Sequence, residues 1–177
     1  MWSYLFAQAH AAQIGEYARV FSLPAVNSSL TMSDLGTVQV GSSLFVGLNP
    51  PQKTDALVLY FFDLSKGDKL AQEFEALKRH YETKHVHLVL ICTEAGPMGP
   101  ISSWVENNIS NIPVLRDKYQ IVSSNYEVSS EPEVFVIDGL GRIFSQTSVA
   151  SSNDIRTVKK DIDNLVHQSE MGEIKPD

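Results

Sequence analysis

Three short runs rich in apolar residues constrain the fold of this chain more than any other feature. Each run has the length of a strand and lacks alternation of polar and apolar residues, so each is expected to be buried on both faces of a sheet. Other segments place apolar residues three and four positions apart, which predicts amphipathic helices. Buried strands that alternate with helices predict an α/β fold with a mainly parallel sheet. The three runs are Ala56–Phe62, His87–Cys92 and Glu133–Asp138.

Further elements complete this order. Two β-hairpins are predicted, over residues 38–46 and 133–147, because turn residues separate two strand-like segments in each. The central sheet is therefore expected to be mixed but mainly parallel, with helices on both faces. The last helix is expected to begin at a cap supplied by Ser151, Ser152 or Asn153. The predicted helices within this region cover residues 70–81, 101–111, 117–125 and 155–165.

The N-terminal segment is predicted to form an extra helix from Trp2 to Phe21, which Pro24 ends. Its aromatic residues are of the kind enriched in protein interfaces. We expect this helix either to dock on a partner protein or to pack against its own domain. The residues expected to bind a partner are Trp2, Leu5, Phe6, Tyr17 and Phe21.

The predicted domain organisation follows from these patterns. A stretch rich in Ser, Thr and Asn follows the first helix and is interpreted as a linker. The polar C-terminal end is interpreted as a tail. The chain is thus divided into an N-terminal docking helix (residues 1–24), a linker (25–34), an α/β domain (35–168) and a polar tail (169–177).

Composition narrows the classes of partner. The formal net charge is −7 and no run of basic residues occurs, so the chain is not expected to bind nucleic acid. No stretch approaches the roughly 20 apolar residues that span a bilayer, although peripheral membrane contact by the N-terminal helix stays open. A secretory signal fits poorly because a basic n-region is missing. An intracellular location is expected, with the mitochondrion and the cytosol both open.

The cysteine content limits the chemistry further. Cys92 is the only cysteine, which excludes an intramolecular disulfide and a zinc site built from several thiolates. It ends a predicted buried strand, where a free cysteine usually behaves as a small hydrophobic residue. His80, His85 and His87 are interpreted as surface residues because no carboxylate pattern completes a ligand set. No metal and no cofactor are therefore expected.

Four segments occur in an informative order along the chain. They are the strand Leu57–Phe62, the helical segment Glu73–Tyr81, the strand and acidic loop Val89–Glu94, and Pro132–Ile143, in which a proline, a strand and an Asp-x-x-Gly turn follow one another. Together they resemble the thioredoxin-like superfamily, and within it the tryparedoxin and nucleoredoxin branch and its peroxiredoxin-like neighbours. The resemblance spans residues 35–167 and implies a thioredoxin-like fold. It also implies a cis Glu131–Pro132 peptide bond.

The chain departs from this pattern where the redox cysteines of the family would stand. By resemblance, the pair falls at Gly67 and Leu70, in the loop Gly67-Asp68-Lys69-Leu70. Thioredoxin chemistry needs an attacking thiolate and a second thiol, three residues later, that resolves the mixed disulfide. Glycine and leucine supply neither group. Asp68 is interpreted as a helix cap or first-turn acid rather than as a catalytic residue.

The favoured hypothesis is a redox-inactive thioredoxin-like protein that is not an enzyme. It would act as an accessory subunit or protein-binding module among the other protein subunits of a larger assembly. The alternative is a single-cysteine, thiol-dependent peroxidase or reductase that uses Cys92. A third hypothesis is the binding of extended peptides in a groove beside Pro132. The exposure of Cys92 discriminates between the first two, because a reactive thiol needs access and a lowered pKa.

Overall fold

A central sheet of five strands organises the molecule, in the order β6-β5-β4-β7-β8. The computed structural model describes residues 12–19, 21–27, 37–40, 45–46, 54–67, 70–129 and 131–172. Strands β4, β5 and β6 run parallel, whereas β7 is antiparallel to β4 and β8 is antiparallel to β7. The predicted mixed sheet is thus confirmed. Its strands are β4 (Ala56–Phe62), β5 (Val86–Cys92), β6 (Val114–Arg116), β7 (Glu133–Asp138) and β8 (Ile143–Ser148).

The three apolar runs of the sequence form β5, β4 and β7, the three inner strands. Side chains on successive residues of β4 point to opposite faces of the sheet. Val58, Tyr60 and Phe62 therefore join one core cluster, while alternate residues such as Leu59 and Phe61 join a second cluster on the other face. Burial on both faces explains why these strands show no polar alternation.

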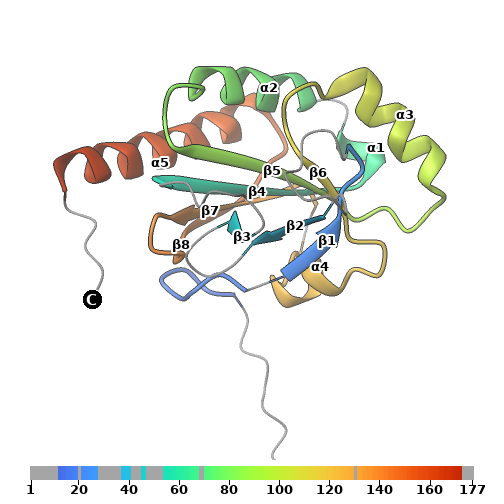
Figure 1. Cartoon of the computed structure of the whole chain (residues 1–177), viewed down its shortest axis with the longest axis horizontal. Helices are drawn as coiled ribbons and strands as arrows, with labels where there is room; N and C mark the ends of the chain where they lie inside the picture. The colour runs from blue at the N-terminus through green and yellow to red at the C-terminus, as the bar shows by residue number, and fades with distance from the viewer. Residues whose placement is uncertain are drawn as a thin grey trace, which may run out of the picture.

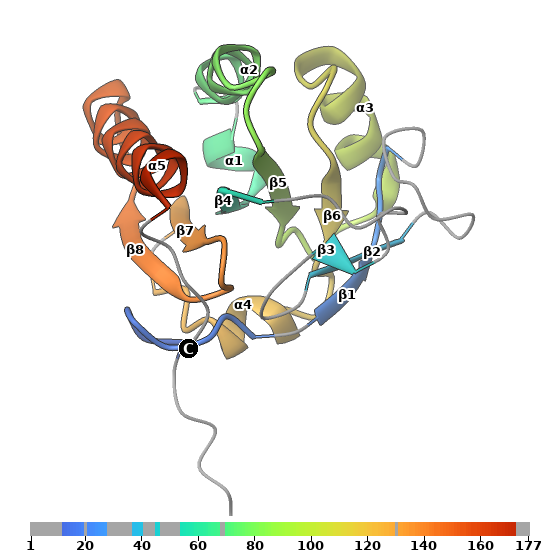
Figure 2. The same cartoon turned by 60° about the vertical axis from the view of Figure 1, so that its left-hand side comes forward.

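The helices cover the two faces unequally (Figures 1 and 2). Helices α2, α3 and α5 lie over one face of the sheet, and the short helix α4 lies with the N-terminal segment over the other. None of the helices in the described ranges is long and apolar enough to cross a lipid bilayer. The helices are α1 (Leu64–Gly67), α2 (Ala71–His80), α3 (Met98–Asn108), α4 (Ile121–Asn125) and α5 (Ser152–Met171).

The N-terminal helix predicted from Trp2 to Phe21 is wrong over its described part. Residues 12–19 form turns and an isolated bridge between Tyr17 and Arg142. Phe21 begins a strand, β1 (Phe21–Pro24), in which Phe21 and Leu23 are buried and the alternate residues are exposed. In this strand every second residue is buried, and this period of two residues indicates a strand. The apolar spacing of three and four residues, which predicted a helix, was misleading here. Trp2, Leu5 and Phe6 lie outside the described residues.

Strand β1 belongs to a second, three-stranded antiparallel sheet in the order β1-β2-β3. The predicted hairpin over residues 38–46 is confirmed, since β2 (Thr37–Val40) pairs with β3 (Phe45–Val46). Pro24 does not end a helix. It pairs with Thr37 at the end of β1, where a missing N–H group is tolerated.

The predicted linker is attached to the domain where it begins. Ala25 forms a bridge with Leu115, and the Val26 N–H group donates to the Val114 carbonyl at 2.7 Å. The Asn27 side chain donates to the Ile112 carbonyl and accepts from the Val114 N–H group, both at 2.8 Å. Residues 25–27 are thus bound to β6, and the rest of the predicted linker lies outside the described residues.

The C-terminal helix starts as predicted and ends later. Ser151 and Asp154 form a capping box at its start. Residues 169–171, assigned to the polar tail from the sequence, continue α5. Gly172 follows with a φ of 71°, a left-handed conformation that glycine adopts without steric cost and that commonly closes a helix.

Phe21 tests whether the N-terminal segment is part of the fold. Its ring meets the Tyr126 ring edge to face, with centroids 6.1 Å apart. We expect Phe21→Ala to lower the free energy of unfolding by about 3 kcal/mol, because it removes a buried ring. Ile14→Ala, at an exposed position of the same segment, should change it by less than about 0.5 kcal/mol. Urea unfolding measures both, and equal stabilities would contradict the packing of β1 on this core.

Candidate functional site

The site suggested by the sequence lies at one edge of the five-stranded sheet. In the sheet register, Phe62 at the end of β4 lies beside Cys92 at the end of β5. Phe61 lies beside Glu133 at the start of β7, so Pro132 reaches the same edge. The Glu131–Pro132 peptide bond is cis, as the resemblance implied. Helix α1 follows β4 directly at this edge (Figure 1).

The two positions that the resemblance assigns to the redox cysteines carry no nucleophile. Gly67 is the last residue of α1, and Leu70 immediately precedes α2. The Leu70 side chain is only 4% exposed and belongs to the core under α2 and α5. Its carbonyl accepts the Phe74 N–H group at 3.1 Å. Asp68 and Lys69 lie outside the described residues, so the capping role expected of Asp68 stays a prediction.

Cys92 is fully buried, at the end of a strand that the sequence predicted to be buried. Burial raises the pKa of its thiol to about 11, although the Glu94 backbone and the charge of Arg116 act in the opposite direction. The thiolate is the reactive form of cysteine. At neutral pH the group is therefore protonated as well as inaccessible, which are the properties of a structural cysteine.

The backbone around Pro132 is held from both sides. The Pro132 carbonyl accepts the Val149 N–H group at 2.9 Å. Next to it, the buried carboxylate of Glu133 accepts the Ser129 N–H group at 3.0 Å and the Gln146 side-chain amide at 2.7 Å. Because both carboxylate oxygens already accept hydrogen bonds, we assign Glu133 to loop positioning rather than to proton transfer.

Tyr60 is a residue of this region that sequence reasoning missed. Its ring stacks on Phe74 with centroids 4.2 Å apart, and within the described segments its buried hydroxyl has no hydrogen-bond partner. Burial, and then the negative charges of Asp63 and Glu131, raise the pKa of Tyr60 above its usual value. The hydroxyl is therefore a neutral donor at physiological pH. An apolar run predicts that such a side chain is buried, but not that its hydroxyl lacks an acceptor.

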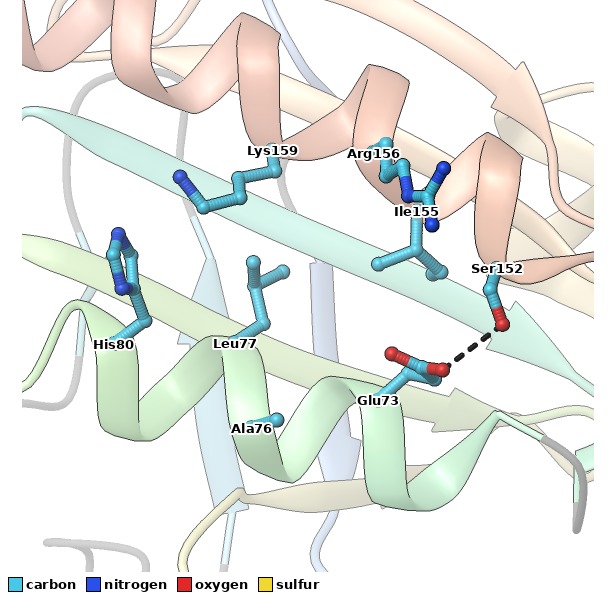
Figure 3. Close-up of a pocket in the computed structure, with 8 residues that line it drawn as sticks. All are labelled: Glu73, Ala76, Leu77, His80, Ser152, Ile155, Arg156 and Lys159. Atoms are coloured by element: carbon cyan, nitrogen blue, oxygen red, sulfur yellow. Dashed lines mark hydrogen bonds between the residues drawn. The ribbon is translucent and has the colours of Figure 1, made fainter.

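A small cavity of about 280 Å³ lies between α2 and α5 (Figure 3). At one end, Ser152 donates to Glu73 at 2.9 Å, while His80 and Lys159 lie at the other end. Lys159 is paired with Asp163 at 2.9 Å. Glu73 and Lys159 thus pair with neighbouring residues on the helix surfaces. The charged groups at the two ends of the cavity do not point toward a common position. In the described part of the chain, no three metal-ligating side chains cluster, at His80 or elsewhere.

A larger cavity of about 510 Å³ lies on the other side of the sheet, between β1 and the segment that leads from β6 into α4. It is lined by residues of β1, by Met98 at the start of α3, and by Arg116 and the residues that follow it. The sequence did not predict this cavity because it assigned the residues of β1 to a helix.

Comparisons with known proteins agree with the thioredoxin-like fold. No protein-family model matches the sequence, and no curated protein matches it significantly. Solved structures do match. A Chlorobium tepidum protein assigned as thiol:disulfide interchange protein DsbE has a TM-score of 0.71 at 18% identity, over 88% of this chain and 99% of its own.

Two further structures extend this likeness. The mitochondrial 2-Cys peroxiredoxin of Plasmodium falciparum has a TM-score of 0.64 at 20% identity, over 93% of this chain and 100% of its own. A thiol-disulfide oxidoreductase of Bacteroides fragilis has a TM-score of 0.61 at 13% identity, over 82% of this chain and 98% of its own. The chain therefore has a thioredoxin-like fold, which these proteins share with it.

Thiol labelling tests the state of Cys92. We expect the native protein to react with DTNB at neutral pH on the order of 100-fold or more slowly than the protein in denaturant, because the thiol is buried and its pKa is raised. Cys92→Ser supplies the blank. Fast labelling of the native protein would contradict this description and would indicate an accessible thiolate.

Proposed function

We propose that this protein is a redox-inactive member of the thioredoxin-like superfamily that works by binding other proteins, as an accessory subunit or binding module. The observation that carries the proposal is the burial of Leu70 at the position of the resolving cysteine. A leucine in the core cannot attack or release a disulfide, and Gly67 cannot do so either. A fold can persist after its site is lost, because function resides in the site.

The exposed side chains of the N-terminal segment support a binding role. Ile14 is 65% exposed and Tyr17 57% exposed, although both lie on a segment anchored to the domain. The Gly15 N–H group donates to the Ile143 carbonyl at 2.8 Å, and the Glu16 carbonyl accepts the Ile143 N–H group at 2.8 Å. Two large apolar side chains are thus presented on a fixed backbone. We place the partner surface here, in an assembly of the mitochondrion or the cytosol.

One observation favours the alternative function, a thiol-dependent peroxidase or reductase. Cys92 lies at the same sheet edge as Pro132, and the positive charge of Arg116 acts to lower the pKa of its thiol. The effect of burial is larger and leaves the pKa raised. Peroxidase activity would therefore require an opening of this edge that exposes the thiol.

An insulin-reduction assay with dithiothreitol, or with a thioredoxin reductase, tests the loss of redox activity. We expect no rate above that of buffer, because no accessible thiol pair exists at residues 67–70. Cys92→Ser should behave like the wild-type chain in this assay and in a peroxide-consumption assay. Turnover that disappears in Cys92→Ser would contradict the proposal and establish the alternative.

Native purification of a tagged chain tests the partner surface. We expect a stoichiometric partner to co-purify with the full chain and to be lost from the double variant Ile14→Ser, Tyr17→Ser. The melting temperature should change little, since both side chains are exposed. Met171→Ser removes an exposed apolar side chain at the end of α5 and should retain the partner. Retention by the double variant would place the binding surface elsewhere.

A further inference from the structure

The cavity between β1 and α4 has the size and walls of a small-molecule site. Its volume of about 510 Å³ lies within the range of roughly 300–1,000 Å³ typical of such sites. Phe21 and Leu23 of β1 line one side, and Val122 of α4 lines the other. Figure 2 shows β1 and α4 next to each other below the five-stranded sheet. The cavity is therefore mostly apolar, opens to solvent beside Tyr119 and Ile121, and is formed by segments far apart in the sequence.

Arg116 introduces a buried positive charge into this apolar lining. The residue is 8% exposed, and one terminal nitrogen, Nη2, donates to the Gly96 carbonyl. The other, Nη1, donates to the Met98 sulfur at 3.9 Å, and a thioether is a weak acceptor. The Nε atom is buried and has no hydrogen-bond partner among the residues that the structure describes. The guanidinium thus retains unused donor capacity beside Met98, which also lines the cavity.

The nearest acid in the sequence, Asp117, also lines the cavity but makes its hydrogen bonds elsewhere. The Asp117 carboxylate accepts the N–H groups of Ile121 at 3.0 Å and Ser123 at 2.7 Å, and so holds the start of α4. Within the described ranges, the hydrogen bonds of Arg116 run to a carbonyl and a sulfur, and none runs to a carboxylate. A buried guanidinium whose donors are only partly used is unfavourable, so an anion that accepts a hydrogen bond from it would be stabilised there.

We propose that this cavity binds a small amphipathic carboxylate, a molecule with an apolar chain and one carboxylate head. The carboxylate would accept a charge-assisted hydrogen bond from Nη1 of Arg116. The chain would pack against Phe21, Leu23 and Val122. Lys118 and Asp117 also line the cavity, so its lining carries two positive charges and one negative charge. This binding is independent of the redox state and of the partner surface proposed above.

Octanoate and 1-octanol are matched probes, because they share an apolar chain and differ in the charged head. We expect octanoate to bind the full chain saturably, at least about tenfold more tightly than 1-octanol, since a charge-assisted pair forms only with the carboxylate. Calorimetric titration measures both affinities. In methyl NMR, the Met98 signal, assigned through Met98→Leu, should shift with the same saturation curve.

Two exposed isoleucines provide a matched pair of variants. Ile121 lines the cavity and is 61% exposed, whereas Ile14 has similar exposure but does not line it. Ile121→Glu should weaken octanoate binding at least about tenfold through like-charge repulsion, with 1-octanol affected less and the melting temperature unchanged. Ile14→Glu should leave octanoate binding unchanged.

Arg116→Met tests the head group directly. In this variant octanoate and 1-octanol should bind with similar affinity, while Arg156→Met, on the exposed face of α5, should bind as the wild type does. Should Arg116→Met not fold, the Ile121→Glu comparison decides the matter alone. Equal binding of the two probes by the wild type, no octanoate binding, or an unchanged affinity in Ile121→Glu would each overturn the proposal.

Discussion

The burial of β4 between β5 and β7 is the constraint on which the rest of the structure depends. Its hydrogen bonds to both neighbours fix a register in which the ends of β4 and β5 meet the start of β7. Its alternate side chains join two separate cores, one under α2 and α5 and one against α4 and β1. The positions of Pro132 and Cys92 at one sheet edge follow from this register. The cavity beside β1 depends on it too, because β1 packs against the second core.

Buried carboxylates hold the loops that surround this sheet. Glu75 accepts the N–H groups of Ser110 and Asn111 at 2.7 and 3.1 Å, and Asp117 and Glu133 accept backbone N–H groups in the same way. In a catalytic site, a buried acid needs a substrate proton within reach. Here each of these acids already serves a loop. Their hydrogen bonds therefore explain how the loops are held in place, and they add no support for an enzymatic function.

The sequence predicts most of the central sheet, because its inner strands are long apolar runs whose burial on both faces is a local property. It also places Pro132 at the start of β7. The sequence-based prediction fails for residues 12–24. The apolar residues at the end of this range fit a helical stripe as well as an alternating strand. The strand forms because Phe21–Pro24 pairs with Thr37–Val40. Contacts between distant segments decide such cases. The Arg116 cavity could not be predicted for the same reason, since β1 forms one of its walls.

The identity of residue 70 connects stability with function. A resolving cysteine has to approach a mixed disulfide, so its side chain needs access from outside the core. Leu70 instead fills the core beside α2, where it adds buried apolar area and so favours the folded state. Sites that demand exposed or strained groups commonly cost stability, and their loss relaxes that demand. Leu70 and Cys92 are both buried, and the features by which we propose that the protein binds other molecules lie on the opposite side of the sheet. They are the exposed Ile14 and Tyr17 and the cavity that contains Arg116, all attached to the N-terminal segment or its neighbours. The segment that departs most from the sequence-based expectation is therefore the one to which we assign the function.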